Sequence, residues 1–169
     1  MKIYLISDAF LGGFSLISAL IVVLNSETNL YEQLKEMISK YDCIEKNQFK
    51  KEVDPREIKK IREYIGRLPF RILVSSCLGS ASLIIYMISI FLKTIYPPLQ
   101  SVSHFVFNFN SCPNYLLYTT GDGLNKIPAN WISNLDLLLS WIQFILVLKF
   151  YSTIFRMIFT RARLSSKIR

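Results

Sequence analysis

The feature that most constrains this chain is its last apolar stretch, Leu135–Phe159. It is long enough to cross a lipid bilayer as one helix, because a membrane helix needs about 20 predominantly apolar residues. Two further stretches, Ile3–Leu24 and Ile72–Leu92, pass the same test. A helix buried in a soluble core would be shorter and would carry more polar residues on its outer face. The sequence therefore predicts an all-α integral membrane protein with three transmembrane helices.

The last stretch also carries polar and charged side chains in its C-terminal half. At about 100° per residue, one helix face collects Lys149, Ser152, Thr153 and Arg156. A charge deep in a membrane is costly and usually faces protein, water or a partner molecule. We therefore predict a polar half-groove formed by these four residues and Gln143. In the alternative interpretation, Lys149 and Arg156 snorkel to the membrane surface and only anchor the helix.

The segment between the first two apolar stretches is charged and carries two short apolar seams. Apolar residues recur there at three- and four-residue spacings, at Leu30, Leu34, Met37 and Tyr41 and again at Ile58, Ile61, Ile65 and Leu68. A turn-like stretch at 42–53 separates the seams, and Asp54-Pro55 is a typical helix start. This pattern predicts a short antiparallel coiled-coil hairpin that needs support from the spans or a partner. The alternative is a solvated linker with some helix.

Small residues mark surfaces on which membrane helices can approach closely. They include Gly12 and Gly13 in the first stretch and Gly79 in the second, so we expect these glycines to serve helix packing. Asp8 either reaches the lipid headgroups or pairs with a cation. The first stretch could also be a cleaved signal peptide, but its length, Asp8 and the lack of a small-x-small site before Asn25 favour a retained span.

The loop after the second stretch is polar and aromatic and has almost no basic residues. Its alternating Phe105, Phe107 and Phe109 indicate either an edge strand or a segment lying among the headgroups. Trp131 and Trp141 bracket the expected outer membrane interface, where tryptophan is favoured.

The distribution of basic residues predicts the orientation in the membrane. They are dense in the hairpin and the C-terminal tail and sparse in the loop, which by the positive-inside rule places the N-terminus outside or in the lumen and the C-terminus in the cytosol. The predicted segments are a first span at 1–24, a cytosolic hairpin at 25–70, a second span at 71–93, an outer loop at 94–134, a third span at 135–159 and a basic cytosolic tail at 160–169.

Charge and composition also argue against several classes of function. The net charge of +8 is concentrated in the C-terminal tail, where it fits contact with membrane lipids better than with nucleic acid. With one histidine, three cysteines and no CxxC, we expect no metal site, cofactor or disulfide framework. An enzyme acting on lipid would need a catalytic constellation that the sequence does not offer, so we expect no enzyme.

This layout resembles the YidC/Oxa-type insertase superfamily, in particular its minimal three-span eukaryotic members, in which a cytosolic coiled coil joins the first two spans. The stretch before the last span is similar to that of the tail-anchored-protein receptors of the tryptophan-rich basic protein family, at Pro128, Trp131, Ile132, Leu135 and Asp136. Two features depart from that family: the hairpin is shorter and the loop before Trp131 is longer.

The resemblance implies a membrane-protein insertion subunit in the endoplasmic reticulum membrane. Such a subunit forms a hydrophilic, membrane-thinning groove with another multi-span protein and receives hydrophobic, tail-anchored clients from a cytosolic targeting ATPase. Its candidate docking surface on the hairpin is basic, with Lys50, Lys51, Arg56, Lys59, Lys60 and Arg62. The alternative function is a structural accessory subunit of a larger membrane complex, such as a respiratory or ATP synthase assembly of the mitochondrial inner membrane.

Overall fold

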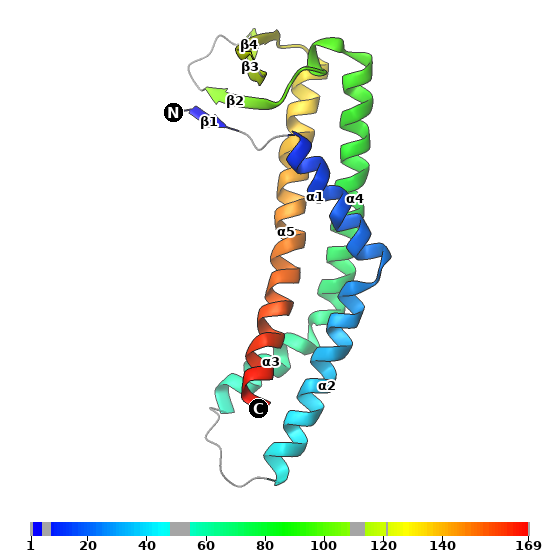
Figure 1. The fold of residues 1–169 in the computed structure, drawn as a ribbon, viewed down its shortest axis with the longest axis vertical. Coiled ribbons are helices and arrows are strands. Elements are labelled where there is room, and N and C mark those ends of the chain that lie inside the picture. The colour runs from blue at the N-terminus through cyan, green and yellow to red at the C-terminus, as the bar shows by residue number, and fades with distance from the viewer. Residues whose placement is uncertain (1, 5–7, 48–54, 109–113, 121, 169) are drawn as a thin grey trace. The chain divides into compact units, whose positions relative to one another are not determined.

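The computed structural model describes residues 2–4, 8–47, 55–108, 114–120 and 122–168. Its helices are α1 (Asp8–Val23), α2 (Ser26–Asn47), α3 (Pro55–Gly66), α4 (Leu68–Ile95) and α5 (Trp131–Ile168), with a short 3₁₀ turn at Pro97–Leu99 (Figure 1). Its strands are β1 (Lys2–Tyr4), β2 (His104–Asn108), β3 (Tyr115–Thr120) and β4 (Gly123–Pro128).

Two of the described helices, α4 and α5, are long and apolar enough to cross a membrane. A third candidate exists if the bent pair Ala9–Val23 and Thr28–Lys40 counts as one span. The protein is therefore a mostly helical membrane protein, as the apolar stretches predicted.

The first predicted span is shorter than the sequence suggested. Its apolar run starts at Ile3, but β1 occupies Lys2–Tyr4 and α1 contains only 16 residues. At about 1.5 Å per residue α1 is about 24 Å long, less than the roughly 30 Å hydrocarbon core of a typical bilayer. After α1 the chain turns at Asn25, whose φ of 50° lies in the left-handed region that asparagine tolerates better than most residues. The side chain of Asp8, at the start of α1, lies outside the described part.

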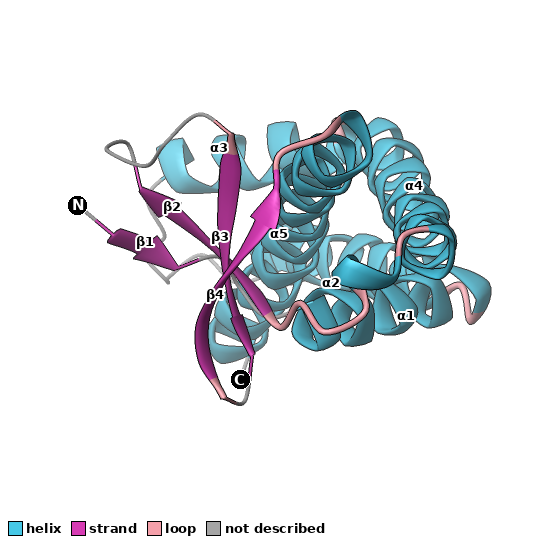
Figure 2. Cartoon of the chain, turned by 90° about the horizontal axis from the view of Figure 1, so that it is seen from above, coloured by secondary structure: helices cyan, strands magenta, loops and turns pink. Residues whose placement is uncertain are grey.

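The prediction of an all-α fold was wrong in the loop between α4 and α5. This loop and β1 form a four-stranded antiparallel sheet with the order β1-β2-β3-β4 (Figure 2). β3 and β4 form a hairpin whose turn needs Gly123, because its φ of 125° is open mainly to glycine. Phe105 and Phe107 lie in β2, an inner strand rather than the edge strand that their alternation suggested; Phe109 lies outside the described residues.

The chain divides into two compact units. The first, which we call the sheet unit, consists of Met1–Ala19 and Gly79–Leu148. Its hydrophobic core joins the sheet and the chain before it to the start of α5, through the buried residues Leu99, Val102, Phe105 and Ile127 and the partly buried Ile132, Leu137 and Trp141.

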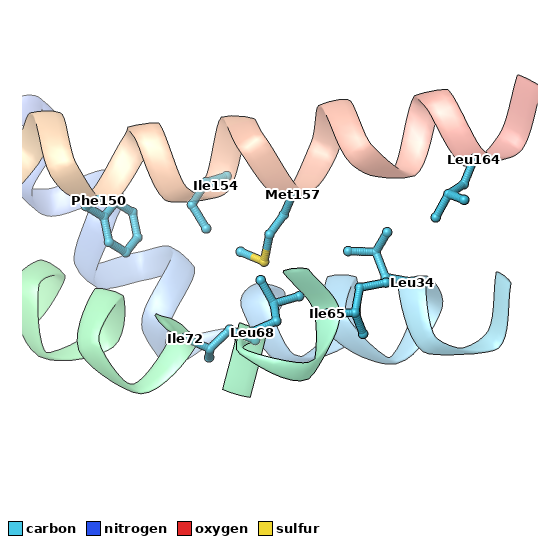
Figure 3. Close-up of a cluster of buried hydrophobic side chains, with 8 residues drawn as sticks. All are labelled: Leu34, Ile65, Leu68, Ile72, Phe150, Ile154, Met157 and Leu164. Atoms are coloured by element: carbon cyan, nitrogen blue, oxygen red, sulfur yellow. The ribbon is translucent and has the colours of Figure 1, made fainter. Parts of the chain in front are cut away.

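The second unit, which we call the hairpin unit, consists of Leu20–Leu78 and Lys149–Arg169. In its core, Phe150, Ile154, Met157 and Leu164 of α5 face Leu34 of α2, Ile65 of α3, and Leu68 and Ile72 of α4 (Figure 3). Leu34, Ile65 and Leu68 belong to the two predicted seams, which therefore meet. They do not form a two-helix core on their own, since α5 contributes half of the buried cluster.

Two boundaries in the hairpin unit differ from the predicted ones. The segment at 160–169, expected as a basic tail, continues α5 as far as Ile168 and buries Leu164. The turn expected at 42–53 is helical as far as Asn47, and its remaining residues lie outside the described part.

Candidate functional site

The packed face of α5 changes from polar to apolar along the helix. In the sheet unit this face carries four buried polar residues at three- and four-residue spacings, Ser133, Asp136, Ser140 and Gln143. In the hairpin unit the same spacing continues with apolar residues, among them Phe150, Ile154 and Met157. We call the first set the buried polar seam. Buried polar groups in membrane helices either join helices by hydrogen bonds or belong to a functional site.

One interhelical hydrogen bond of the seam joins α5 to α1. Gln143 Nε2 donates to Ser15 Oγ over 2.8 Å, and Gln143 is only 2% exposed. This placement corrects the prediction that put Gln143 in the polar half-groove with Lys149. Gln143 lies on the packed face of α5 because its amide finds a partner there, and an amide without a partner would be costly in hydrocarbon.

A second interhelical hydrogen bond of the seam joins α5 to α4. Ser89 Oγ donates to Asp136 Oδ1, and Asp136 is fully buried. The hydroxyl of Ser140, one turn further along α5, donates to the backbone carbonyl of Asp136 over 2.9 Å. Sequence reasoning included Asp136 only as a residue of the resemblance. The repeat of Ser133, Asp136, Ser140 and Gln143 in an otherwise apolar stretch was the signal that could have revealed the seam.

The start of α5 is fixed by a reciprocal cap, which sets the direction in which the seam points. The Ser133 backbone amide donates to Asn130 Oδ1 over 2.9 Å, and the Asn130 backbone amide donates to Ser133 Oγ over 3.0 Å. An N-cap asparagine paired with a hydroxyl three residues later satisfies two backbone donors at once. The cap therefore helps to place Asp136, one turn into the helix, toward Ser89.

The three predicted packing glycines have different surroundings. Gly12 of α1 lies against the ring of Tyr86 on α4, so close that an added Cβ would overlap it. Gly13 has open space where its Cβ would be, and Gly79 is buried in α4. Within the sheet unit, close contact between α1 and α4 thus depends on Gly12 rather than on the pair.

The remaining half-groove residues lie on the outer surface of the hairpin unit. Lys149, Ser152 and Arg156 are exposed, and Thr153, at the edge of this face, is half-buried. Thr153 Oγ1 donates to the Lys149 carbonyl over 3.1 Å. The Lys149 ammonium makes no ion pair with any residue that the structure describes. We call Lys149, Ser152, Thr153 and Arg156 the cationic stripe.

A second cationic feature of the hairpin unit surrounds Tyr64 of α3. The Arg71 guanidinium lies 5.1 Å from the centroid of the Tyr64 ring, which packs against the hydrophobic core. Burial raises the pKa of the Tyr64 phenol, while the charges of Arg71 and Arg156 act in the opposite direction. Both guanidinium groups thus act on one half-buried phenol.

The predicted docking residues that the structure describes lie on α3. Arg56, Lys59, Lys60 and Arg62 are all exposed, and Lys50 and Lys51 lie outside the described part. Near the end of α3, Glu63 accepts from Arg67 over 2.6 Å, so that pair is locally neutral. Among the described residues, no group of three or more His, Cys, Asp or Glu side chains could hold a metal ion.

Comparison with known proteins adds no functional assignment to this geometry. No protein-family model, curated protein or solved structure matches the chain. The buried polar seam, the cationic stripe and the lengths of the helices are the features of the protein that bear on its function.

Proposed function

We propose that this protein is a membrane-embedded subunit of a protein-insertion assembly, and that its cationic stripe receives the polar flank of hydrophobic, tail-anchored clients. The observation that carries the proposal is the exposure of Lys149 on a helix long and apolar enough to span a membrane. Charged residues in such helices normally face a bundle interior, a partner or water. Phe150 and Ile154 occupy the packed face of α5, so Lys149 is available to water, a partner or a client.

The depth of Lys149 argues against a simple anchor. It lies about 10 Å along the helix axis from Arg156, at about 1.5 Å per residue. Side chains of a helix lean toward its N-terminus, so Lys149 leans away from the C-terminal end of α5. The Ser152 hydroxyl on the same face provides a further polar contact for water or a client, and the Thr153 hydroxyl, which donates to the Lys149 carbonyl, can still accept one. Arg156, nearer the end of the apolar stretch, is placed to act where a client enters.

The short α1 supports the same function. A helix of about 24 Å in a bilayer with a core of about 30 Å is accommodated partly by local thinning of the bilayer. Thinning and a water-accessible cationic face both reduce the cost of moving a polar flank across hydrocarbon. No bond chemistry is required of the protein, which acts by lowering a solvation barrier.

Partners and location follow from charge and from the resemblance. The exposed basic residues of α3 offer a surface for an acidic region of a cytosolic targeting ATPase, and another multi-span membrane protein completes the groove. The proposed orientation places the C-terminus in the cytosol, and the proposed compartment is the endoplasmic reticulum membrane. Charge reversal at Lys59 and Lys60 would then reduce ATPase co-purification without loss of the membrane partner.

The experiment measures client insertion into membranes that contain the assembled complex. Lys149→Leu should reduce insertion of a tail-anchored client while the partners still co-purify. Lys149→Arg keeps the charge and should retain most of the activity. Unchanged insertion with Lys149→Leu, in complexes of normal composition, would exclude the stripe as the client path.

A structural accessory subunit is the second candidate. The observation in its favour is the number of large apolar side chains that α4 exposes, including Leu73, Ile84 and Phe91, which a larger assembly could cover. Under this function Lys149→Leu leaves client insertion unchanged, whereas Phe91→Ser, on the exposed apolar surface of α4, dissociates the complex. Co-purification with respiratory or ATP synthase subunits would favour this candidate.

A further inference from the structure

Two arginines of the hairpin unit act on the same phenol and have no acidic partner among the described residues. Arg71 of α4 lies over the Tyr64 ring, and the charge of Arg156 of α5 acts on the same phenol. The ion pairs Lys40–Glu36 and Arg67–Glu63 do not involve either arginine, and Glu63, next to Tyr64 in the sequence, is paired with Arg67. Two uncompensated guanidinium groups favour a ligand with a negative charge.

The position of these arginines along their helices corresponds to a membrane boundary. Arg71 immediately precedes the apolar stretch that starts at Ile72, and Arg156 lies near the end of the other stretch at Phe159. Ile72 and Ile154 belong to one buried cluster, so the start of α4 lies beside this part of α5 (Figure 3). Both guanidinium groups are thus placed where an apolar surface gives way to a polar one, which is the level of lipid phosphates.

The apolar side chains next to the arginines favour a lipid over a soluble anion. Phe70, beside Arg71, is 72% exposed, and Phe155, beside Arg156, is 71% exposed. An acyl chain would cover such side chains, whereas inorganic phosphate would leave them in contact with solvent. Guanidinium groups bind phosphate oxygens in a fork geometry that an ammonium cannot reproduce.

We infer that Arg71, which lies over the Tyr64 ring, and Arg156, on the part of α5 that packs beside the start of α4, bind the phosphate of an anionic phospholipid. The lipid headgroup lies between the start of α4 and the C-terminal part of α5, and its acyl chains run along the exposed phenylalanines. The site requires only the hairpin unit and a bilayer. Arg156 also belongs to the cationic stripe, but lipid binding is measured without a client, so it can fail or hold separately from the proposed insertion function.

The test is a lipid titration of the full-length protein in detergent, followed by native mass spectrometry. Phosphatidylserine is compared with phosphatidylcholine for the wild type, for Arg71→Gln/Arg156→Gln, and for Lys59→Gln/Lys60→Gln as a control with the same loss of charge. We expect the arginine variant to bind phosphatidylserine at least about tenfold more weakly, since it loses two charge-assisted contacts and losing even one costs about tenfold, while the lysine variant stays within about twofold of wild type.

Three outcomes would overturn the inference. One is unchanged affinity in the arginine variant, and another is an equal loss in the two variants, which would indicate diffuse attraction by net charge. The third is displacement of phosphatidylserine by an equal concentration of inorganic phosphate, which would identify the ligand as a soluble anion. If the glutamine variant does not fold, Arg71→Lys/Arg156→Lys keeps the charge and should still bind severalfold more weakly than wild type because the fork is lost.

Discussion

The contact of Gly12 with Tyr86 gives a quantitative prediction with a built-in control, because Gly13 is the adjacent residue of the same helix. A Cβ at Gly12 would lie 2.6 Å from Tyr86 Oη, whereas a Cβ at Gly13 would meet nothing within 4 Å. Replacing a helical glycine by alanine gains up to about 1 kcal/mol from helix propensity. Overpacking a fitted contact costs about 1–3 kcal/mol.

Gly13→Ala should therefore raise the free energy of unfolding by up to about 1 kcal/mol, because only the propensity term applies. Gly12→Ala should give a lower free energy of unfolding than Gly13→Ala, by up to about 1–3 kcal/mol, because the half-buried Tyr86 ring must shift to accept the new methyl group. The assay is unfolding of the purified protein in mixed micelles by increasing sodium dodecyl sulfate, followed by circular dichroism.

The Tyr86 ring can be removed to separate a steric effect from other causes. In a Tyr86→Leu background, Gly12→Ala and Gly13→Ala should change the free energy of unfolding by similar amounts, since the overlapping atoms are gone. If Gly12→Ala stabilises the otherwise wild-type protein as much as Gly13→Ala does, the close contact between α1 and α4 is refuted.

Three other predictions test the polar interactions. Ser15→Ala should lower the free energy of unfolding by about 0.6–2 kcal/mol in the same assay, because it leaves the Gln143 amide without its partner. Adding Gln143→Leu should recover much of this loss, and no recovery would contradict the contact. Asp136→Leu should lower the free energy of unfolding by about 1–3 kcal/mol more than Asp136→Asn, because asparagine keeps an acceptor for the Ser89 hydroxyl. Equal losses in the two variants would count against that hydrogen bond. Finally, the raised pKa of Tyr64 means that the folded state keeps a proton which the unfolded chain loses near pH 10, so stability should fall as pH rises through about 10. The difference in tyrosinate absorbance between wild type and Tyr64→Phe should have its midpoint above the ordinary tyrosine pKa of about 10, and a midpoint at or below it would be inconsistent with a buried phenol.

The sequence predicted α4 and α5 well because membrane helices need long apolar runs, which are visible in one dimension. It also identified Leu34 and Ile65 of the two apolar hairpin seams, because apolar residues at three- and four-residue spacings share one helix face. It missed the sheet because β1 is part of an apolar run and pairs with a strand far along the chain, with Lys2 opposite Asn108. Such pairing leaves no local pattern, and three-residue strands are too short for alternation to be read.

The candidate site was predicted only in part, for related reasons. Lys149 and Arg156 were placed on one face by helix periodicity, which needs no tertiary information. Gln143 was grouped with them by polarity, although its direction on the helix is that of Asp136 and Phe150. The Arg71–Tyr64 contact joins two helices, so no spacing within either helix could indicate it.

The most direct test of the central claim is site-specific photo-crosslinking during insertion of a tail-anchored client. A photoreactive residue replaces either Ser152, on the cationic stripe, or Ile158, exposed on another face of α5. The proposed function predicts client adducts from the Ser152 position, few from Ile158, and loss of the adducts when Lys149→Leu is added. Equal labelling of the client from both positions, or none from Ser152 while the client is inserted normally, would contradict the claim that the stripe is the client path.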